Sequence, residues 1–356
     1  MTPRGRRQLL IGSAAALASA AVPARAGQGL RLSLNENAFG PSPRVAEAIE
    51  AELVRLNRYV ETDEADALRA QIAALEQVSP DQVVLGEVLE PLGVHLGARS
   101  FLGGDVVYST PGYTALVDSG APFGLAGQGV PLNAALENDL PALARAIGRR
   151  TVAVSLVNPH NPSGTVSDIA ALDAFITDAA QHTLVIVDEA YLEYDARFAD
   201  RSAIRHVRKG ANVLVFRTLA KVYGLAGLAM GYAVAPKPLA GELRAVGIGT
   251  PHSLDRLSLA AARAALTDQA YVRTVRDRVA GERERLHAAL DGRGIRRSDS
   301  HANFVFFAPS DPEALRKRFS EADIQIARAF PPLDRWIRVT IGTPAEVQRV
   351  INVLSA

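Results

Sequence analysis

Short apolar runs recur along the middle of the chain, and each gives way abruptly to polar residues. Three of them span residues 152–157, 184–187 and 213–216, and all are rich in β-branched side chains. Such runs are typical of strands that are buried on both faces of a parallel sheet. They alternate with Ala-, Leu- and Arg-rich helical stretches between residues 63 and 236, which predicts a right-handed succession of strand–helix–strand units.

The pattern changes in the C-terminal third of the chain. A long helical region is expected at 253–290, where the charges of 273–285 form a solvated face. Strand-like segments at 303–307 and 336–341 then flank a helix expected at 312–321. This alternation predicts a second, smaller α+β domain.

The first 26 residues have the features of a signal peptide. Arg6 and Arg7 precede a soft apolar run at 9–22, and the segment ends in a small-x-small site at Ala26. The paired arginines indicate the twin-arginine export route, and hence a periplasmic protein that is cleaved after about Ala26. The alternative is a retained anchor, but the run is short of the ~20 apolar residues that span a bilayer, so no stable membrane anchor is expected.

Removing this leader changes the charge balance of the chain. The leader holds four of the 39 basic residues and none of the 38 acidic ones, so the net charge falls from +1 to −3. No basic patch with interleaved aromatics is present, and no nucleic-acid partner is expected. Cysteine is absent, which excludes disulfides and thiolate metal sites. No metal site is predicted.

Polar residues that suit one cofactor follow the three central strands. Asn161, Asp188 with Tyr191, and Lys221 come after successive apolar runs, and parallel strands bring their carboxyl ends to one edge of the sheet. Pyridoxal 5′-phosphate (PLP) needs a lysine amine for a Schiff base and a carboxylate at its pyridine nitrogen. Lys221 and Asp188 meet these needs, Asn161 and Tyr191 are placed to bond the ring oxygen, and Tyr113 is placed to stack on the ring. Each residue alone has an ordinary structural explanation; their order after three strands favours a PLP site.

At these residues the chain resembles a known family over nearly its whole length after the leader. It is similar to the fold type I PLP-dependent aminotransferases of class I/II, closest to the histidinol-phosphate aminotransferase branch. The resemblance implies a large domain with a mostly parallel sheet flanked by helices, and a smaller α+β domain. The stretches that carry it are 34–37, 40–43, 158–165, 187–191, 217–221, 224–228, 302–304 and 338–343.

The resemblance also implies substrate-binding residues and a subunit arrangement. Arg338 matches the arginine that grips the substrate α-carboxylate through a bidentate pair. Asn35 begins a segment, 35–43, that resembles the arm closing over the active site, and Arg328 matches a residue that helps to bind the substrate side chain. Tyr59 matches a tyrosine that reaches the cofactor phosphate of the neighbouring subunit, which implies a homodimer.

The departures from the family pattern cluster around the cofactor phosphate. The loop that opens the first helix of the large domain lacks the usual small polar residues, so only backbone N–H groups, at Leu89 and Glu90, remain to bind phosphate there. The serine expected before the lysine is Ala220, and the arginine expected eight residues after it is Ala229. Thr218 remains as a hydroxyl donor.

These departures predict a PLP site that binds its cofactor more loosely than related sites do. Losing one charge-assisted phosphate contact costs about 1.5–3 kcal/mol, or roughly tenfold to a hundredfold in affinity. Arg217 is considered as a substitute cation for the missing arginine.

The expected division of the chain follows from these points. It consists of a signal peptide at 1–26, an N-terminal arm and small-domain segment at 27–58, a large PLP-binding domain at 59–240 and a small C-terminal domain at 241–356.

The expected function is amino transfer between an amino acid, or a related amine, and a 2-oxo acid. An aromatic or other bulky amino acid is the leading substrate, because export separates the protein from cytoplasmic histidinol phosphate. Two alternatives stay open. One is another PLP reaction on the same fold (decarboxylation, racemisation, elimination or cyclisation), and the other is a pseudoenzyme or binding protein that has kept the fold.

Overall fold

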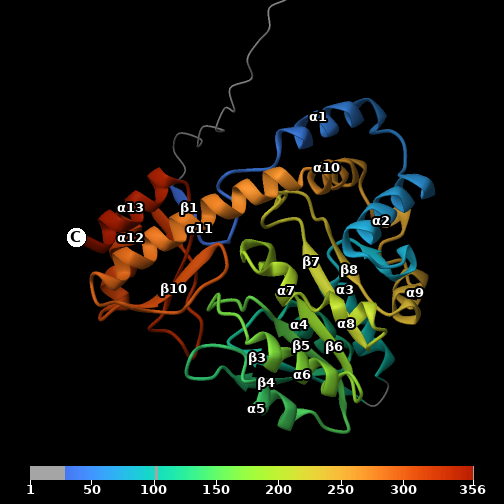
Figure 1. Cartoon of the computed structure of the whole chain (residues 1–356), viewed down its shortest axis with the longest axis horizontal. Coiled ribbons are helices and arrows are strands. Elements are labelled where there is room, and N and C mark those ends of the chain that lie inside the picture. The colour runs from blue at the N-terminus through green and yellow to red at the C-terminus, as the bar shows by residue number, and fades with distance from the viewer. Residues whose placement is uncertain (1–28, 101–102, 356) are drawn as a thin grey trace, which may run out of the picture.

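A seven-stranded sheet forms the centre of the large domain (Figure 1). The structure is a computed structural model that describes residues 29–100 and 103–355, so the predicted leader and its cleavage site lie outside the described residues. The strand order is β2-β8-β7-β6-β5-β3-β4, and β8 runs antiparallel to both of its neighbours while the other pairings are parallel. The mostly parallel sheet is therefore confirmed. Its strands are β2 (Val83–Leu85), β3 (Gly104–Thr110), β4 (Leu125–Pro131), β5 (Thr151–Val157), β6 (Leu184–Asp188), β7 (Val213–Thr218) and β8 (Gly231–Val234).

Helices cover both faces of this sheet, because successive strand residues point to opposite faces and both sets are apolar. Ile186 and Leu214 face a cluster with α3, α4 and α9, whereas Val185 and Val213 face a larger cluster with α2, α5, α6 and α8. These helices are α2 (Thr62–Glu76), α3 (Leu89–Arg99), α4 (Ala115–Gly120), α5 (Leu140–Ala146), α6 (Ile169–Ala179), α8 (Ile204–Arg208) and α9 (Lys237–Ala245), and the short α7 (Phe198–Arg201) precedes α8.

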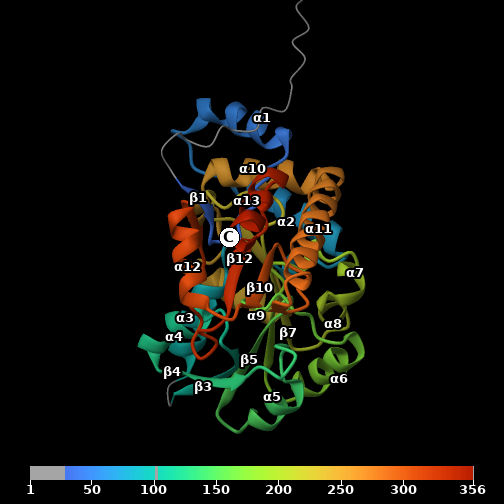
Figure 2. The ribbon, with the colours of Figure 1, turned by 90° about the vertical axis from the view of Figure 1, so that its left-hand side faces the viewer.

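The C-terminal part builds a second layer from short strands and long helices (Figure 2). The order β12-β10-β9 forms an antiparallel sheet, and β1, at the start of the described chain, pairs in parallel with β11. The N-terminal segment is thereby tied to the C-terminal part. The elements are β1 (Leu30–Leu32), α1 (Pro43–Glu52), α10 (Arg256–Thr267), α11 (Gln269–Asp291), β9 (Arg296–Arg297), β10 (Phe304–Ala308), α12 (Pro312–Glu321), β11 (Ile324–Ile326), β12 (Ile337–Thr340) and α13 (Pro344–Ser355). Short 3-10 helices lie at η1 (Leu53–Arg55), η2 (Pro80–Gln82), η3 (Ala121–Phe123), η4 (Leu192–Tyr194) and η5 (Pro251–Ser253).

Two expectations for the long helical region were wrong in detail. The region is split at Asp268, which ends α10 and caps α11 by accepting a hydrogen bond from the Tyr271 N–H at 3.1 Å. The charges that follow do not all face solvent. Arg283 is buried and donates to the Ala302 carbonyl at 3.0 Å, because α11 packs its flank against the segment that leads into β10. Within the described ranges, no helix is both long enough and apolar enough to cross a membrane.

Candidate active site

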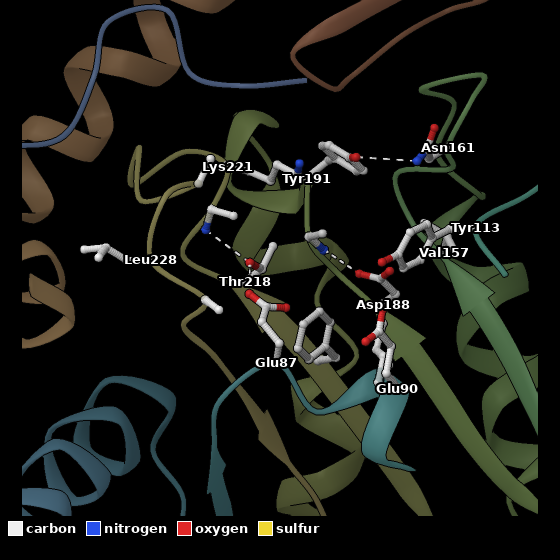
Figure 3. Close-up of a pocket in the computed structure, with 16 residues that line it drawn as sticks. Glu87, Glu90, Tyr113, Val157, Asn161, Asp188, Tyr191, Thr218, Lys221 and Leu228 are labelled. Atoms are coloured by element: carbon white, nitrogen blue, oxygen red, sulfur yellow. Dashed lines mark hydrogen bonds between the residues drawn. The ribbon is translucent and has the colours of Figure 1, made fainter. Parts of the chain in front are cut away.

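A cavity of about 390 Å³ lies where β5, β6 and β7 end (Figure 3). The last residues of these strands, Val157, Asp188 and Thr218, all line it, as expected for the carboxyl edge of a parallel sheet. The sequence-predicted residues that share the cavity are Leu89, Glu90, Tyr113, Asn161, Asp188, Tyr191, Thr218, Ala220, Lys221 and Ala229. Glu87 also lines it and was not predicted as a site residue.

Asp188 is the buried carboxyl group of this cavity. It ends β6 and is 4% exposed, and its Oδ1 accepts a hydrogen bond from the Ala190 N–H at 2.9 Å. The pKa of Asp188 is raised to about 7, because burial and the nearby Glu87 outweigh the Ala190 hydrogen bond and the charge of Lys221, which lower it. The site thus holds a carboxylate that gains from a cationic partner in the cavity.

Lys221 stands three residues beyond the end of β7, on a loop that the N-terminal arm holds in place. Its Nζ donates to the Leu34 carbonyl at 3.3 Å and lies 5.8 Å from the centroid of the Tyr191 ring. Gly224, at φ +75°, lets the loop approach the arm closely, since a Cβ there would come within 2.6 Å of the Gly40 backbone. Asn37 adds a side-chain bond to the Val222 carbonyl at 3.0 Å. The lysine is therefore positioned by two segments that lie far apart in the sequence.

The Tyr191 hydroxyl is the centre of a hydrogen-bond network. Its oxygen accepts from Asn35 Nδ2 at 3.0 Å and from Asn161 Nδ2 at 3.5 Å. Two N–H donors on one phenolic oxygen leave its own O–H directed elsewhere. The Tyr191 ring meets Phe304 edge-on, with centroids 5.1 Å apart, which fixes its orientation. Asn35 is itself held by Thr340, whose hydroxyl accepts from the Asn35 backbone N–H at 2.9 Å.

Arg338 lies on β12 beside the cavity and is joined to it through Asn161. Its Nη1 donates to Asn161 Oδ1 and its Nη2 donates to the Ser33 carbonyl at 2.8 Å. The side chain is buried between the rings of Phe304 and Phe330, and burial lowers the pKa of Arg338 to about 10. Among the described residues it has no acidic partner within salt-bridge distance, and its Nε lacks a hydrogen-bond acceptor. A buried guanidinium of this kind is stabilised by an anion that binds beside it.

The remaining aromatic and basic candidates occupy different surroundings. Tyr113 lines the cavity and is 49% exposed, and burial of its hydroxyl raises the pKa of Tyr113 to about 12. Arg328 is exposed and stacks over Phe330 at 5.0 Å, outside the cavity lining. Tyr59 is 78% exposed and also lies outside the lining, with its ring 5.6 Å from that of His252.

The end of the cavity beside α3 carries the acid Glu87 where only backbone N–H groups were expected to bind phosphate. Helix α3 begins at Leu89 without a side-chain cap, so its first N–H groups are open to a ligand. Thr218 Oγ1 accepts from the Ala220 N–H at 3.1 Å and donates to Glu87 Oε1. Ala220 and Ala229 contribute methyl groups only. The Glu87–Thr218 contact escaped the sequence analysis, although an acid in this loop was a signal that could have suggested it.

The suggestion that Arg217 replaces the missing phosphate arginine was wrong. Its side chain is buried on the opposite side of β7 from the cavity, where Nη1 bonds Glu76 at 2.8 Å and Nη2 bonds Glu189 at 3.0 Å. These ion pairs hold the guanidinium in place, since separating a buried pair leaves an uncompensated charge.

The described part of the chain contains no group of three or more His, Cys, Asp or Glu side chains arranged to hold a metal ion.

The chain is similar to aminotransferases throughout the described fold. The family model "Aminotransferase class I and II" matches residues 28–354. A histidinol-phosphate aminotransferase of Limosilactobacillus fermentum is 35% identical over 331 residues, covering 92% of this chain and 90% of the relative. Histidinol-phosphate aminotransferase 2 of Caulobacter vibrioides is 37% identical over 330 residues, which cover 92% of this chain and 85% of the relative.

A solved structure agrees with these sequence relatives. The histidinol-phosphate aminotransferase of Sinorhizobium meliloti, in complex with pyridoxal 5′-phosphate, superposes with a TM-score of 0.81 at 29% identity and covers 92% of this chain and 90% of that one. The match over nearly the whole chain, together with the lysine and the buried carboxylate in one cavity, leads to one conclusion. The chain belongs to the class I and II aminotransferase family and is a PLP-dependent aminotransferase.

Proposed function

We propose that this enzyme transfers an amino group from an aromatic or other bulky amino acid to a 2-oxo acid, with PLP held in the 390 Å³ cavity. The observation that carries the proposal is the placement of Lys221 and the buried Asp188 in one cavity, beside an arginine that lacks an acidic partner among the described residues. The residues at the ring end of the cavity fit the cofactor. A buried carboxylate suits a protonated pyridine nitrogen, and the Tyr191 hydroxyl suits the ring oxygen.

The proposed roles follow from these positions. With PLP in the cavity, Asp188 would stabilise a proton on the ring nitrogen, Asn161 and Tyr191 would bond the ring oxygen, and Tyr113 would stack on the ring. When bound, PLP supplies an electron sink for negative charge on the substrate α-carbon. The Lys221 amine would hold the cofactor and move a proton at that carbon, and Leu34 and Asn37 keep the lysine and its loop in place.

Arg338 supports an amino acid as the substrate. Its guanidinium uses two N–H groups on Asn161 and Ser33, which leaves three of its five donors for a carboxylate. In this proposal Asn35 positions Tyr191 beside the substrate and Arg328 contributes from the exposed rim. The relatives are named for histidinol phosphate, an amine without a carboxylate. The leader-like segment disfavours that substrate here, because it indicates export away from the cytoplasm.

The test is a panel of amino donors with 2-oxoglutarate or pyruvate as acceptor. The panel contains aromatic, aliphatic and acidic amino acids together with histidinol phosphate. We expect aromatic or bulky amino acids to give the highest kcat/KM. A preference for histidinol phosphate would contradict the proposed substrate class and leave the aminotransferase assignment in place.

We further propose a homodimer in which Tyr59 reaches the partner's cofactor phosphate. The support is an exposed apolar strip near α1, in which Leu53, Val54, Leu56 and Tyr59 are 49%, 85%, 60% and 78% exposed. Exposed apolar patches of this kind mark interaction surfaces. Sedimentation equilibrium is expected to give twice the chain mass, and Tyr59→Phe is expected to weaken PLP binding without dissociating the dimer. A monomer with full PLP affinity would contradict this arrangement.

The export proposal rests on residues 1–26 and has its own test. Cell fractionation is expected to place the protein in the periplasm, with a mass that corresponds to cleavage after about Ala26. Replacing Arg6 and Arg7 by lysine is expected to keep the full-length chain inside the cytoplasm. Cleaved periplasmic protein from that variant would rule out the twin-arginine route.

A further inference from the structure

We propose that PLP binds to this enzyme together with a proton, which Glu87 takes up at the phosphate end of the cofactor site. The inference rests on the proposed placement of PLP in the cavity and concerns a residue that the predicted roles did not include. At this end of the cavity, Thr218 Oγ1 donates a hydrogen bond to Glu87 Oε1. Figure 3 shows this pair on the side of the cavity away from Asn161 and Tyr191.

The chemistry of the cofactor identifies this side as the phosphate end. The hydroxyl and the phosphomethyl group of PLP stand on opposite edges of its pyridine ring, with the aldehyde between them. If Asn161 and Tyr191 bond the hydroxyl edge, the phosphate points towards Thr218 and the start of α3 at Leu89. The phosphate thus arrives where the Glu87 carboxylate already occupies the Thr218 hydroxyl.

An ionised Glu87 opposes the phosphate in two ways. It repels the negative charge, and it holds the hydroxyl that the phosphate needs. A protonated Glu87 reverses both effects, because its O–H donates to a phosphate oxygen and it releases Thr218 for the same purpose. The side chains of Ala220 and Ala229 are methyl groups, so they supply no donor or charge that offsets an ionised carboxylate.

The charged groups around Glu87 favour proton uptake when phosphate arrives. Glu90 on α3 and Asp188 on β6 are acidic, Tyr113 adds a weakly acidic phenol, and Lys221 is the cation whose charge acts on Glu87. Burial raises the pKa of Glu87 and the Glu90 charge raises it further, while the Thr218 hydrogen bond and Lys221 lower it. A bound PLP would exclude water from Glu87 and add negative charge, and both changes raise the pKa in the complex.

The space behind Glu87 does not supply a cation either. A second cavity of about 270 Å³ lies on the far side of Glu87 and Ala229, and both residues line the two cavities. The other titratable group in its lining is Asp255, another acid, which caps α10 by accepting from the Ser258 N–H at 2.7 Å. An ionised Glu87 that turned away from the phosphate would therefore face Asp255.

The sign of the pH effect follows from proton linkage. The apoprotein and PLP combine with one proton wherever Glu87 is ionised before binding and neutral after it. Above the pKa of Glu87 in the apoprotein, affinity for PLP then falls by up to about tenfold for each pH unit from this group alone. Below that pKa the contribution vanishes. The lysine, the ring nitrogen and the phosphate also titrate and affect the affinity for PLP. The contribution of Glu87 is therefore obtained by subtracting the pH dependence of a variant with a neutral residue at 87 from that of the parent.

The experiment measures Kd for PLP and for pyridoxal, which lacks the phosphate, between pH 6 and 8.5. The proteins are the full-length parent, Glu87→Gln and Glu313→Gln, each stripped of cofactor. Glutamine at 87 keeps the size of the side chain and, like the protonated acid, carries a donor for the phosphate, but it cannot ionise. Glu313→Gln is the control, because it removes the same charge from an exposed position on α12, outside the cavity lining. Calorimetry in two buffers of different ionisation enthalpy counts the protons taken up by the parent and by Glu87→Gln.

We expect Glu87→Gln to bind PLP more tightly than the parent at pH 8.5, by tenfold or more, and this advantage to shrink as the pH falls. Pyridoxal affinity should differ little between these two proteins, and Glu313→Gln should keep the PLP affinity and the pH slope of the parent. Equal slopes for the parent and Glu87→Gln, or equal proton counts, would overturn the inference. Failure of every protein to bind either ligand would overturn the proposed function as well.

Discussion

The most informative substitution at the substrate end is Arg338→Gln. The glutamine removes the charge and the three N–H donors that Asn161 and Ser33 do not use, while a polar group remains beside Asn161. A substrate carboxylate held by two charge-assisted hydrogen bonds gains about 1.5–3 kcal/mol from each, or about 3–6 kcal/mol together. That energy corresponds to a loss of roughly 10²- to 10⁴-fold in kcat/KM.

The assay compares two donors that differ only in the carboxylate, phenylalanine and phenethylamine, with 2-oxoglutarate as acceptor. In the parent the amino acid should be greatly preferred. In Arg338→Gln the kcat/KM for phenylalanine should fall by the factor above, while that for phenethylamine changes little. Arg335→Gln, an exposed arginine that bonds the Ser310 carbonyl, is the control and should behave as the parent does. An equal fall for both donors would refute a specific contact with the carboxylate, and so would an unchanged preference.

Three further predictions concern the cofactor end. Lys221→Ala should abolish 2-oxo acid formation and the absorbance band of the lysine-linked cofactor, whereas the exposed Lys209→Ala should keep both; activity in Lys221→Ala would contradict its role. Burial raises the pKa of Asp188 above its ordinary value to about 7, so ionising Asp188 costs the folded apoprotein stability as pH rises from 4 to 8. Urea unfolding should therefore show cofactor-free Asp188→Asn equal to the parent at pH 4 and more stable at pH 8, by at most about 4 kcal/mol; a less stable variant at pH 8 would contradict this sign. Ala229→Arg should tighten PLP binding by about tenfold to a hundredfold through a charge-assisted phosphate contact, and Ala229→Gln should recover far less; if the arginine adds nothing in a direct titration, the site is already complete.

The part of the site that depends on strand ends could be predicted from the sequence. β-branched runs identify buried parallel strands, and the carboxyl ends of such strands meet at one edge of the sheet. That rule alone brings Asn161, Asp188 and Lys221 together, and all three line the cavity. Tyr191 follows Asp188 closely enough to share that position.

Contacts between distant segments could not be predicted in this way. Asn35 reaches Tyr191 across 156 residues, because β1 pairs with β11 and carries the arm to the cavity. Side chains on β7 point alternately to the two faces of the sheet, and Phe216 and Thr218 point into the cavity. The Arg217 side chain therefore points to the other face, where it forms ion pairs with Glu76 and Glu189. The antiparallel orientation of β8 could not be predicted either, because its apolar residues suit a parallel strand equally well and the orientation is set by pairing with β2 and β7.

The central claim is amino transfer through the cavity that holds Lys221 and Asp188, and an isotope experiment tests it directly. Parent protein loaded with PLP is mixed with a ¹⁵N-labelled amino acid and an unlabelled 2-oxo acid, and the products are followed by NMR. We predict that the label appears in the amino acid derived from the acceptor, at the rate at which the donor becomes its 2-oxo acid. Loss of the donor as carbon dioxide or free ammonia, or no loss at all, would contradict the account.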